Sequence, residues 1–496
     1  MCRIFRECPI NIFRRFHWNY LLNGLFAILV FSLFSCKSNA QEKPNIVYIM
    51  LDEWGYYEMS SLGHPLIETP AIDLFALEGM RFTQFLAGAN VCAPARAALM
   101  LGQHTGHTSV RYNSGATPIK KEDLTIAQVL RNAGYATGGF GKWGLGDRGT
   151  SGVPELHGFD IFFGYYHQVH AHTYFPNYLL KNSEKIPLEG NTGHAFKGET
   201  FSQYLVHEEA KNFIREYAGK QPFFAYLPYT LPHAYYGIPE DDPAYLKYKN
   251  RNWDAPQHHF NPDVAPHDEA KRYAAFIAMA DRMIGEILKL LKETGIDDNT
   301  VVFLSGDNGA NTSVFRNEKY PNGFFAPNTD PKTEKTFRGG KGNFYEGGLR
   351  VPYVVRWPGH IKAGVVSDFL GYFPDVMPTL ADIAGVNIPE HIDGISFLPT
   401  LLDDQSKEQE KHEYLYWEDA NQVAMRMNHW KAIKPSTSAA FELYNLTDDI
   451  EEQVNVADKH PELIEKFKQF AKLAHQPQVH GDIFDEALGF KGHKAK

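Results

Sequence analysis

Cys92 begins the string Cys92-Ala93-Pro94-Ala95-Arg96, which combines a sulfur nucleophile, a helix start and a cation. Pro94 suits the first turn of a helix because its missing N–H costs nothing there, and Gly102 is a typical helix stop. We therefore expect Cys92 at or just before a helix N-terminus, where backbone N–H groups and the helix dipole attract an anion. A thiol in that position has a lowered pKa, so the segment predicts a reactive site that faces an anion. The alternative is an inert thiol buried before a helix.

Carboxylate and amide side chains follow two apolar runs of strand length. Asp52 and Glu53 come after residues 45–51, and Asp307 and Asn308 follow the run that begins at residue 300. Such oxygen ligands favour Ca²⁺ or Mg²⁺ over zinc. The alternative for each pair is an ordinary set of polar residues at a strand end.

Three further polar residues could bind an anion or transfer a proton. Lys142 and Lys341 lie in glycine-rich segments, where an ammonium group can closely approach a ligand. His233 follows Thr230-Leu231-Pro232 and could donate a proton to a leaving oxygen. Solvated lysines and a structural histidine are the alternatives.

The elements that must position these residues alternate between strands and helices. Apolar runs at 45–51, 135–140, 222–227 and 300–304 alternate with helical patterns at 69–78, 124–132 and 269–292. This order predicts an α/β fold with a large central mixed, mostly parallel sheet flanked by helices. Ligands bind beyond the carboxyl ends of such strands, which is where the polar clusters lie.

The pattern changes after residue 402. A charged stretch at 403–411 precedes four short strand-like pieces and a helical pattern at 461–474. We predict a catalytic domain at 41–402 and a smaller C-terminal domain at 403–496, with an antiparallel sheet and one helix.

Residues 1–40 have the composition of a signal peptide. Basic residues precede an apolar stretch at 20–34 that is too short for a spanning helix. Cleavage before Cys36 would leave a lipid anchor in the outer membrane, and cleavage after Ala40 would release the chain into the periplasm. The third interpretation is that residues 1–40 stay attached as an uncleaved membrane anchor. After either cleavage Cys92 is the only candidate thiol, since Cys36 would carry lipid if it remained.

Composition narrows the class of partner. The chain has 496 residues, is 43% hydrophobic and has a formal net charge of −10. It lacks the basic stretches that nucleic-acid binding requires, so we exclude that partner. An anionic substrate would need positive charge concentrated in the site itself.

These motifs occur in an order that resembles one family, the formylglycine-dependent type I sulfatases of the alkaline-phosphatase-like superfamily, in particular bacterial polysaccharide sulfatases. The resemblance covers nearly the whole exported chain. The matching segments are 45–53, 69–73, 79–83, 92–102, 141–143, 232–233, 306–309, 339–342, 345–348, 350–352, 394–399 and 442–446.

The resemblance implies a mechanism. A formylglycine-generating maturation enzyme would oxidise Cys92 to formylglycine, whose hydrate attacks sulfur through one hydroxyl and expels sulfate through the other. A divalent cation, Ca²⁺ with Mg²⁺ as the alternative, would neutralise the sulfate oxygens. The implied metal ligands are Asp52, Glu53, Asp307 and Asn308. The implied catalytic residues beside Cys92 are Arg96, which supports the hydrate, and Lys142, Lys341 and His233, which bind sulfate.

Two residues depart from the pattern of the family. Glu53 stands where relatives usually have a second aspartate, and Gly144 stands where many have a histidine that handles a proton of the hydrate. Because histidines are dense at 102–107 and 167–172, we hypothesise that one of them substitutes. The candidates are His104, His107, His170 and His172.

The aromatic and histidine-rich stretch at 165–176 is either core packing or a sugar-binding wall, with His170 and His172 as candidate substrate-binding residues. The resemblance implies a sulfated carbohydrate substrate of the galactose or N-acetylgalactosamine type. Two alternatives stay open: a phosphodiester or phosphonate ester hydrolase of the same superfamily, and a non-catalytic glycan-binding relative.

Overall fold

The computed structural model describes residues 43–113, 117–258 and 268–484. The predicted signal peptide and its cleavage sites lie outside these ranges. Within them, every helix is too short or too polar to span a bilayer.

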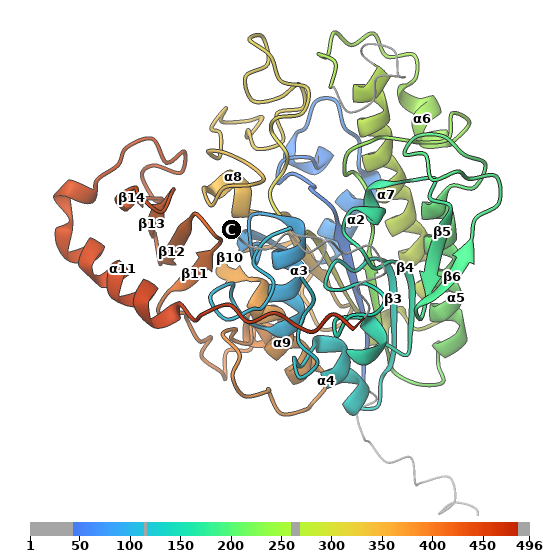
Figure 1. The fold of residues 1–496 in the computed structure, drawn as a ribbon, viewed down its shortest axis with the longest axis horizontal. Helices are drawn as coiled ribbons and strands as arrows, with labels where there is room; N and C mark the ends of the chain where they lie inside the picture. The colour runs from blue at the N-terminus through green and yellow to red at the C-terminus, as the bar shows by residue number, and fades with distance from the viewer. Residues whose placement is uncertain (1–42, 114–116, 259–267, 485–496) are drawn as a thin grey trace, which may run out of the picture. The chain divides into compact units, whose positions relative to one another are not determined.

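Strands and helices alternate along the first three quarters of the chain (Figure 1). The strands are β1 (Asn45–Leu51), β2 (Met80–Leu86), β3 (Ala136–Lys142), β4 (Ile161–Tyr165), β5 (Tyr178–Lys181), β6 (Glu184–Pro187), β7 (Phe223–Pro228), β8 (Thr300–Gly306), β9 (Tyr353–Arg356), β10 (Val365–Tyr372), β11 (Leu415–Glu418), β12 (Val423–Met427), β13 (Trp430–Lys434) and β14 (Glu442–Asn445). The helices are α2 (Pro70–Glu78), α3 (Cys92–Leu101), α4 (Ile126–Asn132), α5 (Ser202–Tyr217), α6 (Pro243–Tyr248), α7 (Asp268–Glu293), α8 (Glu346–Leu349), α9 (Val376–Ile383), α10 (Leu398–Leu402) and α11 (Pro461–Ala474).

Among the described residues, ten strands form one sheet in the order β10-β2-β9-β8-β1-β7-β3-β4-β5-β6. The central strands β4, β3, β7, β1 and β8 run parallel, and antiparallel pairs occur toward both edges. The predicted mixed, mostly parallel sheet is therefore confirmed. The strands β2, β4, β5, β6, β9 and β10 were not predicted.

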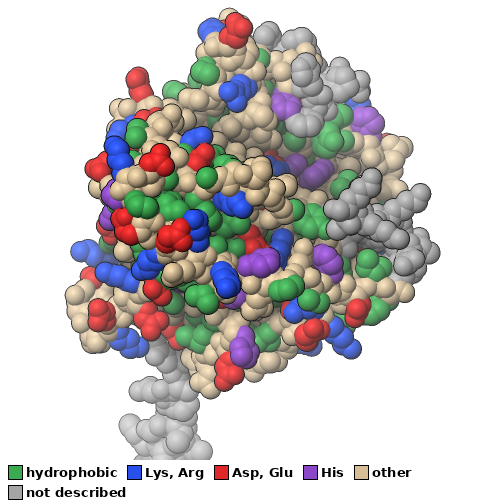
Figure 2. All heavy atoms as spheres, turned by 60° about the vertical axis from the view of Figure 1, so that its left-hand side comes forward, with side chains coloured by type: hydrophobic (Ala, Val, Ile, Leu, Met, Phe, Trp, Pro, Cys, Tyr) green, Lys and Arg blue, Asp and Glu red, His purple; other side chains and the backbone are tan. Residues whose placement is uncertain are grey.

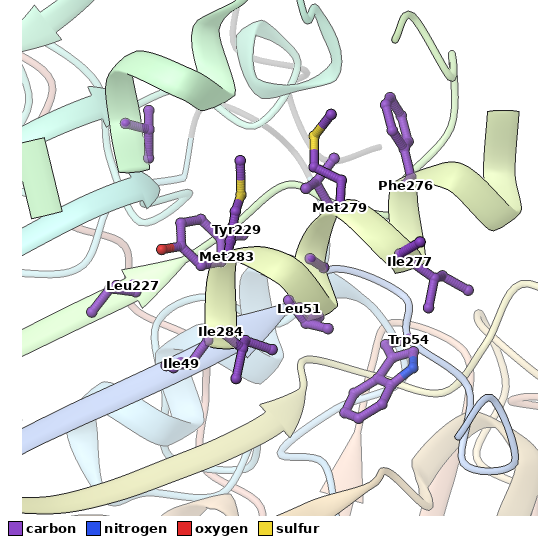
Figure 3. Packing of buried hydrophobic residues seen from close by; sticks show 14 of the residues in the cluster. Ile49, Leu51, Trp54, Leu227, Tyr229, Phe276, Ile277, Met279, Met283 and Ile284 are labelled. Carbon is purple, nitrogen blue, oxygen red and sulfur yellow. The ribbon is translucent and has the colours of Figure 1, made fainter. Parts of the chain in front are cut away.

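Helices cover both faces of this sheet because its central strands are apolar on both sides. Val47, Ile49 and Leu51 of β1 pack into the core beneath α2, α5 and α7, whereas Ile46 and Tyr48 pack into the core beneath α3, α4 and α9. Figure 3 shows part of the first of these layers, with Ile284 of α7 beside Ile49 of β1.

Local sequence signals explain several helix boundaries. The apolar residues of α7 recur at three- and four-residue spacing, as predicted, and all but its polar stripe is buried. Helix α3 begins at Cys92 and ends at Gly102, whose φ of 64° is the left-handed conformation that glycine adopts at helix ends.

The C-terminal part forms the predicted antiparallel sheet, in the order β11-β12-β13-β14, with α11 packed against it. The chain then runs back to the loops that follow α3 and β3. Gln476 N–H donates to the Gly106 carbonyl, and Ser151 N–H donates to that of Asp482. The domain boundary at 402–403 stays a prediction.

Candidate active site

The carboxyl ends of four neighbouring parallel strands carry the polar side chains of the site. β3, β7, β1 and β8 lie side by side in the sheet. Lys142 is the last residue of β3, His233 follows β7, Asp52 follows β1 and Asp307 follows β8. Because parallel strands end at one edge, residues far apart in the sequence come together there.

Cys92 and Arg96 approach this edge from α3. The Cys92 thiol lies 3.3 Å from Asp52 Oδ1. The Arg96 guanidinium, one helical turn later, donates to Asp307 Oδ2 at 2.8 Å and to the Lys142 carbonyl at 2.7 Å. Both side chains are completely buried, so α3 places a sulfur atom and a fixed positive charge beside the strand-end acids.

Hydrogen bonds from neighbouring residues of the site hold the two aspartates in place. Asp52 Oδ2 accepts from Lys142 Nζ at 2.5 Å, and Asp307 Oδ1 accepts from the Glu53 backbone N–H at 3.0 Å. Glu53 has a φ of 65°, an unfavourable conformation for a residue with a side chain that is often found at functional sites. The buried Asn308 Oδ1 has no hydrogen-bond partner among the described residues.

These groups fit a divalent cation. One ligand atom each from Asp52, Glu53, Cys92 and His233 lies within 4.8 Å of the others. The orphaned Asn308 oxygen follows directly after Asp307, so the donor set is rich in oxygen, as Ca²⁺ and Mg²⁺ prefer. Of the four metal ligands implied by the resemblance, Asp52 and Glu53 belong to this group and Asp307 bonds to the Glu53 backbone, and the role of all four as ligands stays a prediction.

His233 and Lys341 form the more accessible side of the site. His233 Nε2 lies 2.7 Å from Glu53 Oε1 and 3.2 Å from Lys341 Nζ, and Lys341 also pairs with Glu53. The Lys341 side chain is 18% exposed, whereas that of Lys142 is fully buried. A ligand would therefore approach Cys92 from the Lys341 side.

The charges around the acids shift their pKa values in opposite directions. Burial raises the pKa of Asp52, but the Lys142 ammonium and other nearby cations outweigh it and hold the pKa well below its usual range. Burial and the charge on Asp52 raise the pKa of Asp307 to about 6. Asp52 is thus the more firmly ionised of the two.

The pKa of the Cys92 thiol differs from the sequence-based expectation. Burial, followed by the charge on Asp52, raises it well above its ordinary value, although Cys92 begins a helix as predicted. The expectation considered only the helix dipole, which is a smaller effect than the loss of water and a carboxylate at 3.3 Å. An unmodified Cys92 is therefore a neutral thiol and a poor nucleophile.

Burial also lowers the pKa values of the basic groups of the site. It lowers the pKa of Lys341 to about 8 and that of His233 to about 4. The ring of His172 stacks on that of His233 with 4.1 Å between centroids. Burial, with the charge of His233 next, lowers the His172 pKa to about 2.

Only one of the four candidate substitute histidines contacts the site residues named above, and it is His172. His104 and His107 lie beyond the far end of α3, about 15 Å from Cys92 along the helix axis. His107 Nδ1 bonds to Asp393 at 2.9 Å, and His104 Nδ1 accepts from Gly106 N–H. The hypothesis is wrong for these two because Asp393, remote in sequence, holds them elsewhere.

The aromatic stretch at 165–176 is mainly core. Tyr165, Tyr166 and Tyr174 are buried, which excludes their ring faces as an open sugar-binding wall. His170 packs against the rings of Tyr165 and Tyr178. One residue of this stretch was missed: Gln168, whose buried side chain lies against Gly144. A single glutamine carries no periodic or motif signal that could have identified it.

The cations of the site, Arg96 and Lys142 among them, are buried at the sheet edge. On the face drawn in Figure 2, acidic and basic side chains are interspersed. A cavity of about 590 Å³ beside β10 and the C-terminal sheet is lined by Arg350, His412 and Arg426, among others, and by none of the residues around Cys92. The anion-binding groups of the site are buried at the sheet edge.

A parallel sheet whose strand ends gather acids, ammonium groups and a helix-borne nucleophile defines a hydrolase of the alkaline-phosphatase-like superfamily. A model of the sulfatase family matches residues 44–386, and one of the N-sulphoglucosamine sulphohydrolase C-terminal region matches 339–476. The chain therefore belongs to the sulfatase family and is a sulfuric ester hydrolase.

Individual relatives agree with this assignment. The chain is 31% identical to N-acetylgalactosamine-6-sulfatase of Mus musculus, over 80% of this chain and 72% of the relative. It is 28% identical to a sulfatase of Formosa agariphila, over 88% and 89%. The solved structure of Ps i-CgsB in complex with k-i-k-neocarrahexaose has a TM-score of 0.72 and 26% identity, covering 90% of this chain and 96% of that chain.

Proposed function

We propose that this sulfatase hydrolyses sulfate esters of a sulfated glycan, using formylglycine made from Cys92 and a divalent cation, Ca²⁺ or else Mg²⁺. The single observation that carries the proposal is the convergence of Cys92, Asp52, Glu53 and His233, whose ligand atoms lie within 4.8 Å of one another. Formylglycine supplies a hydrated aldehyde as the nucleophile, and the cation supplies positive charge for the sulfate oxygens.

The residues of the chain then have distinct roles. Asp52, Glu53, Asp307 and Asn308 hold the cation. Lys142 and Lys341 bind the sulfate oxygens, and their present pairing with Asp52 and Glu53 shows that each reaches the same few ångströms as the metal ligands. Such preorganised charge lowers the barrier most where water is excluded.

Arg96 and His233 complete the proposed machinery. Arg96 is held by Asp307 and the Lys142 carbonyl, so its guanidinium is fixed beside residue 92 and supports the nucleophile. His233 donates a proton to the leaving alcohol. Its pKa of about 4 leaves His233 neutral in the free enzyme, so in this proposal the bound sulfate raises that pKa and lets His233 carry the proton that it donates.

Maturation must precede folding in this proposal. All residues of α3 are buried, including Cys92 through Arg96, so a formylglycine-generating enzyme could reach this segment only in the unfolded chain. The proposed exported location, in the periplasm or on an outer-membrane lipid anchor, fits maturation before or during export.

The substrate class rests on the relatives. One acts, by its name, on N-acetylgalactosamine 6-sulfate, and another was solved with a neocarrahexaose. We propose a galactose- or N-acetylgalactosamine-type sulfate. The phosphodiester or phosphonate alternative is not favoured, because the matching family model and these relatives are sulfatases.

Sulfate release from a panel of defined sulfated saccharides tests the proposal. We expect turnover on a galactose- or N-acetylgalactosamine-type sulfate, loss of that turnover after chelation, and an aldehyde mass on the residue 92 peptide. An enzyme with the aldehyde that cleaves aryl phosphodiesters faster than every sulfate would instead support the alternative hydrolase. A residue 92 peptide that keeps its sulfur after co-expression with a maturation enzyme would support the glycan-binding alternative.

A further inference from the structure

The space beside Gly144 is filled by a side chain from another strand connection. A Cβ atom at Gly144 would lie 2.8 Å from Gln168 Oε1 and 3.8 Å from Arg96 Cδ. Gly144 also has a φ of 82°, which disfavours any residue with a side chain. The carboxamide of Gln168 therefore occupies the position that a side chain at 144 would need, next to the stem of Arg96.

Gln168 is buried at an unusual cost. Its exposed fraction is 3%, yet neither Nε2 nor Oε1 has a hydrogen-bond partner among the described residues. A buried amide without partners costs about 1–3 kcal/mol, so such a group is expected to have a partner when the protein functions. Arg96 is not that partner in this structure, because its guanidinium donates to Asp307 and the Lys142 carbonyl and makes no hydrogen bond to Gln168.

The connection that carries Gln168 is fixed at both ends to the site. At its start, the Tyr166 carbonyl accepts from Gly144 N–H at 3.0 Å. At its end, His172 stacks on His233. The segment that carries Gln168 is thus held to the Lys142 side of the site at Tyr166 and to the His233 side at His172.

Cys92 and Arg96 are four residues apart on α3 and so share one face of the helix. We propose that Gln168 is a positioning residue, whose carboxamide hydrogen-bonds an oxygen carried by the side chain derived from Cys92, on the Arg96 side. This inference rests on the proposed function. It replaces our hypothesis of a substitute histidine with a neutral amide, which orients the group but does not titrate.

Two variants test this role, Gln168→Leu and Gln168→Glu, against the matched control Gln203→Leu. Gln203 is equally buried and has an unpartnered Oε1, but it lies on α5 beside Ser202. Each protein is first measured for aldehyde content by the mass of the residue 92 peptide, so that rates are expressed per matured enzyme.

We expect Gln168→Leu to lower kcat on an aryl sulfate about 10- to 100-fold with little change in KM, the effect of one lost hydrogen bond at a reacting centre. The reaction rate of the residue 92 aldehyde with an aminooxy probe should change several-fold as well. Gln203→Leu should match the wild type in both measurements.

The isosteric variant separates positioning from packing. Gln168→Glu retains a donor only when its carboxyl is protonated, so its kcat should rise as the pH falls, relative to the wild type. Equal kcat, probe rate and pH profile for the Gln168 variants and the control would overturn the role of Gln168. If the wild type forms the aldehyde but releases no sulfate, the proposed function fails instead, whatever the variants do.

Discussion

The protein contains two buried clusters of opposite charges, and they differ in what they leave unpaired. The active-site cluster comprises Asp52, Glu53, Asp307, Arg96, Lys142 and Lys341. The inter-sheet cluster joins α8 to the C-terminal sheet and comprises Glu346, Glu452, Arg350, Arg426 and Lys431.

The inter-sheet cluster satisfies its own charges. Glu346 lies 2.6 Å from Arg350, 2.9 Å from Lys431 and 3.7 Å from Arg426, and Lys431 also lies 3.0 Å from Glu452. Burial would raise the pKa of Glu346, but Lys431 and the two arginines hold it well below its usual range. Each charged group has an opposite charge within 3.7 Å, as a structural network requires, although Arg426 Nη1 and Glu452 Oε1 make no hydrogen bond among the described residues.

The active-site cluster pairs its charges but leaves neutral polar atoms unpaired around them. Asn308 Oδ1, His233 Nδ1 and the Gln168 amide are buried without partners among the described residues. Buried polar atoms without partners are expected where a bound ligand supplies the missing hydrogen bonds. The comparison therefore predicts that changes in the active-site cluster alter activity, whereas changes in the inter-sheet cluster alter stability.

Replacing Cys92 with alanine should have the largest effect. We expect kcat for sulfate release to fall by at least about 10³-fold, because the precursor of the nucleophile is removed. The loss of one buried sulfur should cost only about 1 kcal/mol of stability. Initial rates and a urea titration measure the two quantities. A variant that keeps more than a tenth of the wild-type kcat would contradict a nucleophile at residue 92.

Replacing Glu346 with glutamine should lower the stability of the protein but leave its kcat nearly unchanged. Arg350, Arg426 and Lys431 would lose their shared counter-charge inside the protein, which typically costs about 3–5 kcal/mol. Equilibrium unfolding measures this loss. The folded fraction should keep kcat within about threefold of the wild type.

The control for that prediction is Glu293→Gln, which removes an exposed acid that pairs only with Lys289, 3.4 Å away on the same helix. We expect this variant to lose at most about 0.5 kcal/mol of its free energy of unfolding. A large loss of activity per folded molecule in the Glu346 variant would remove the distinction between the two clusters.

Much of the large sheet and of the site could be predicted because both depend on short segments. The apolar runs that became β1 and β8 end at Asp52 and Asp307, and parallel strands bring their ends together. Gln168 and Asp393 could not be predicted, because their roles depend on contacts with Gly144 and His107 across long stretches of chain. Strands β2 and β10 were missed because their residues are only partly buried and lack a continuous apolar pattern, and β9 was missed because its buried run is only four residues long.

Replacing Asp307 with asparagine sharpens the comparison within the active-site cluster. The change removes a charge that both the proposed cation and Arg96 use, so we expect about a 100-fold loss of kcat and weaker metal binding. Bound metal per protein and the rise of Tm on adding Ca²⁺ measure the second effect. Asp281→Asn, a buried acid bonded to Ile72 N–H away from the site, should keep both the metal and the Ca²⁺-dependent Tm. Full metal content in the Asp307 variant would exclude it as a ligand.

Glu58 shows what happens to a buried acid that has no cation beside it. It is fully buried and, within the part of the chain that the structure describes, accepts only from the Tyr273 hydroxyl, at 2.5 Å, and Gly55 N–H, at 2.8 Å. Burial raises its pKa from 4.5 to about 7, whereas the cations around Glu346 and Asp52 lower theirs. Glu58 is thus a third kind of buried acid, because the folded protein holds the proton of Glu58 more tightly than the unfolded chain does.

The sign of the resulting pH dependence follows from this raised pKa. The contribution of Glu58 to the free energy of unfolding is fully present below about pH 4.5 and is lost as the pH rises through about 7. Between pH 5 and pH 8 we expect the protein to lose about 2 kcal/mol of stability from this group. Glu58→Gln should remove this part of the dependence, since an amide keeps both hydrogen bonds without ionising. Urea unfolding at several pH values would measure it, and equal slopes for wild type and variant would mean that Glu58 titrates normally. In that case burial without a nearby cation would not raise the pKa of an acid, and the contrast between Glu58 and the acids held among cations would be lost.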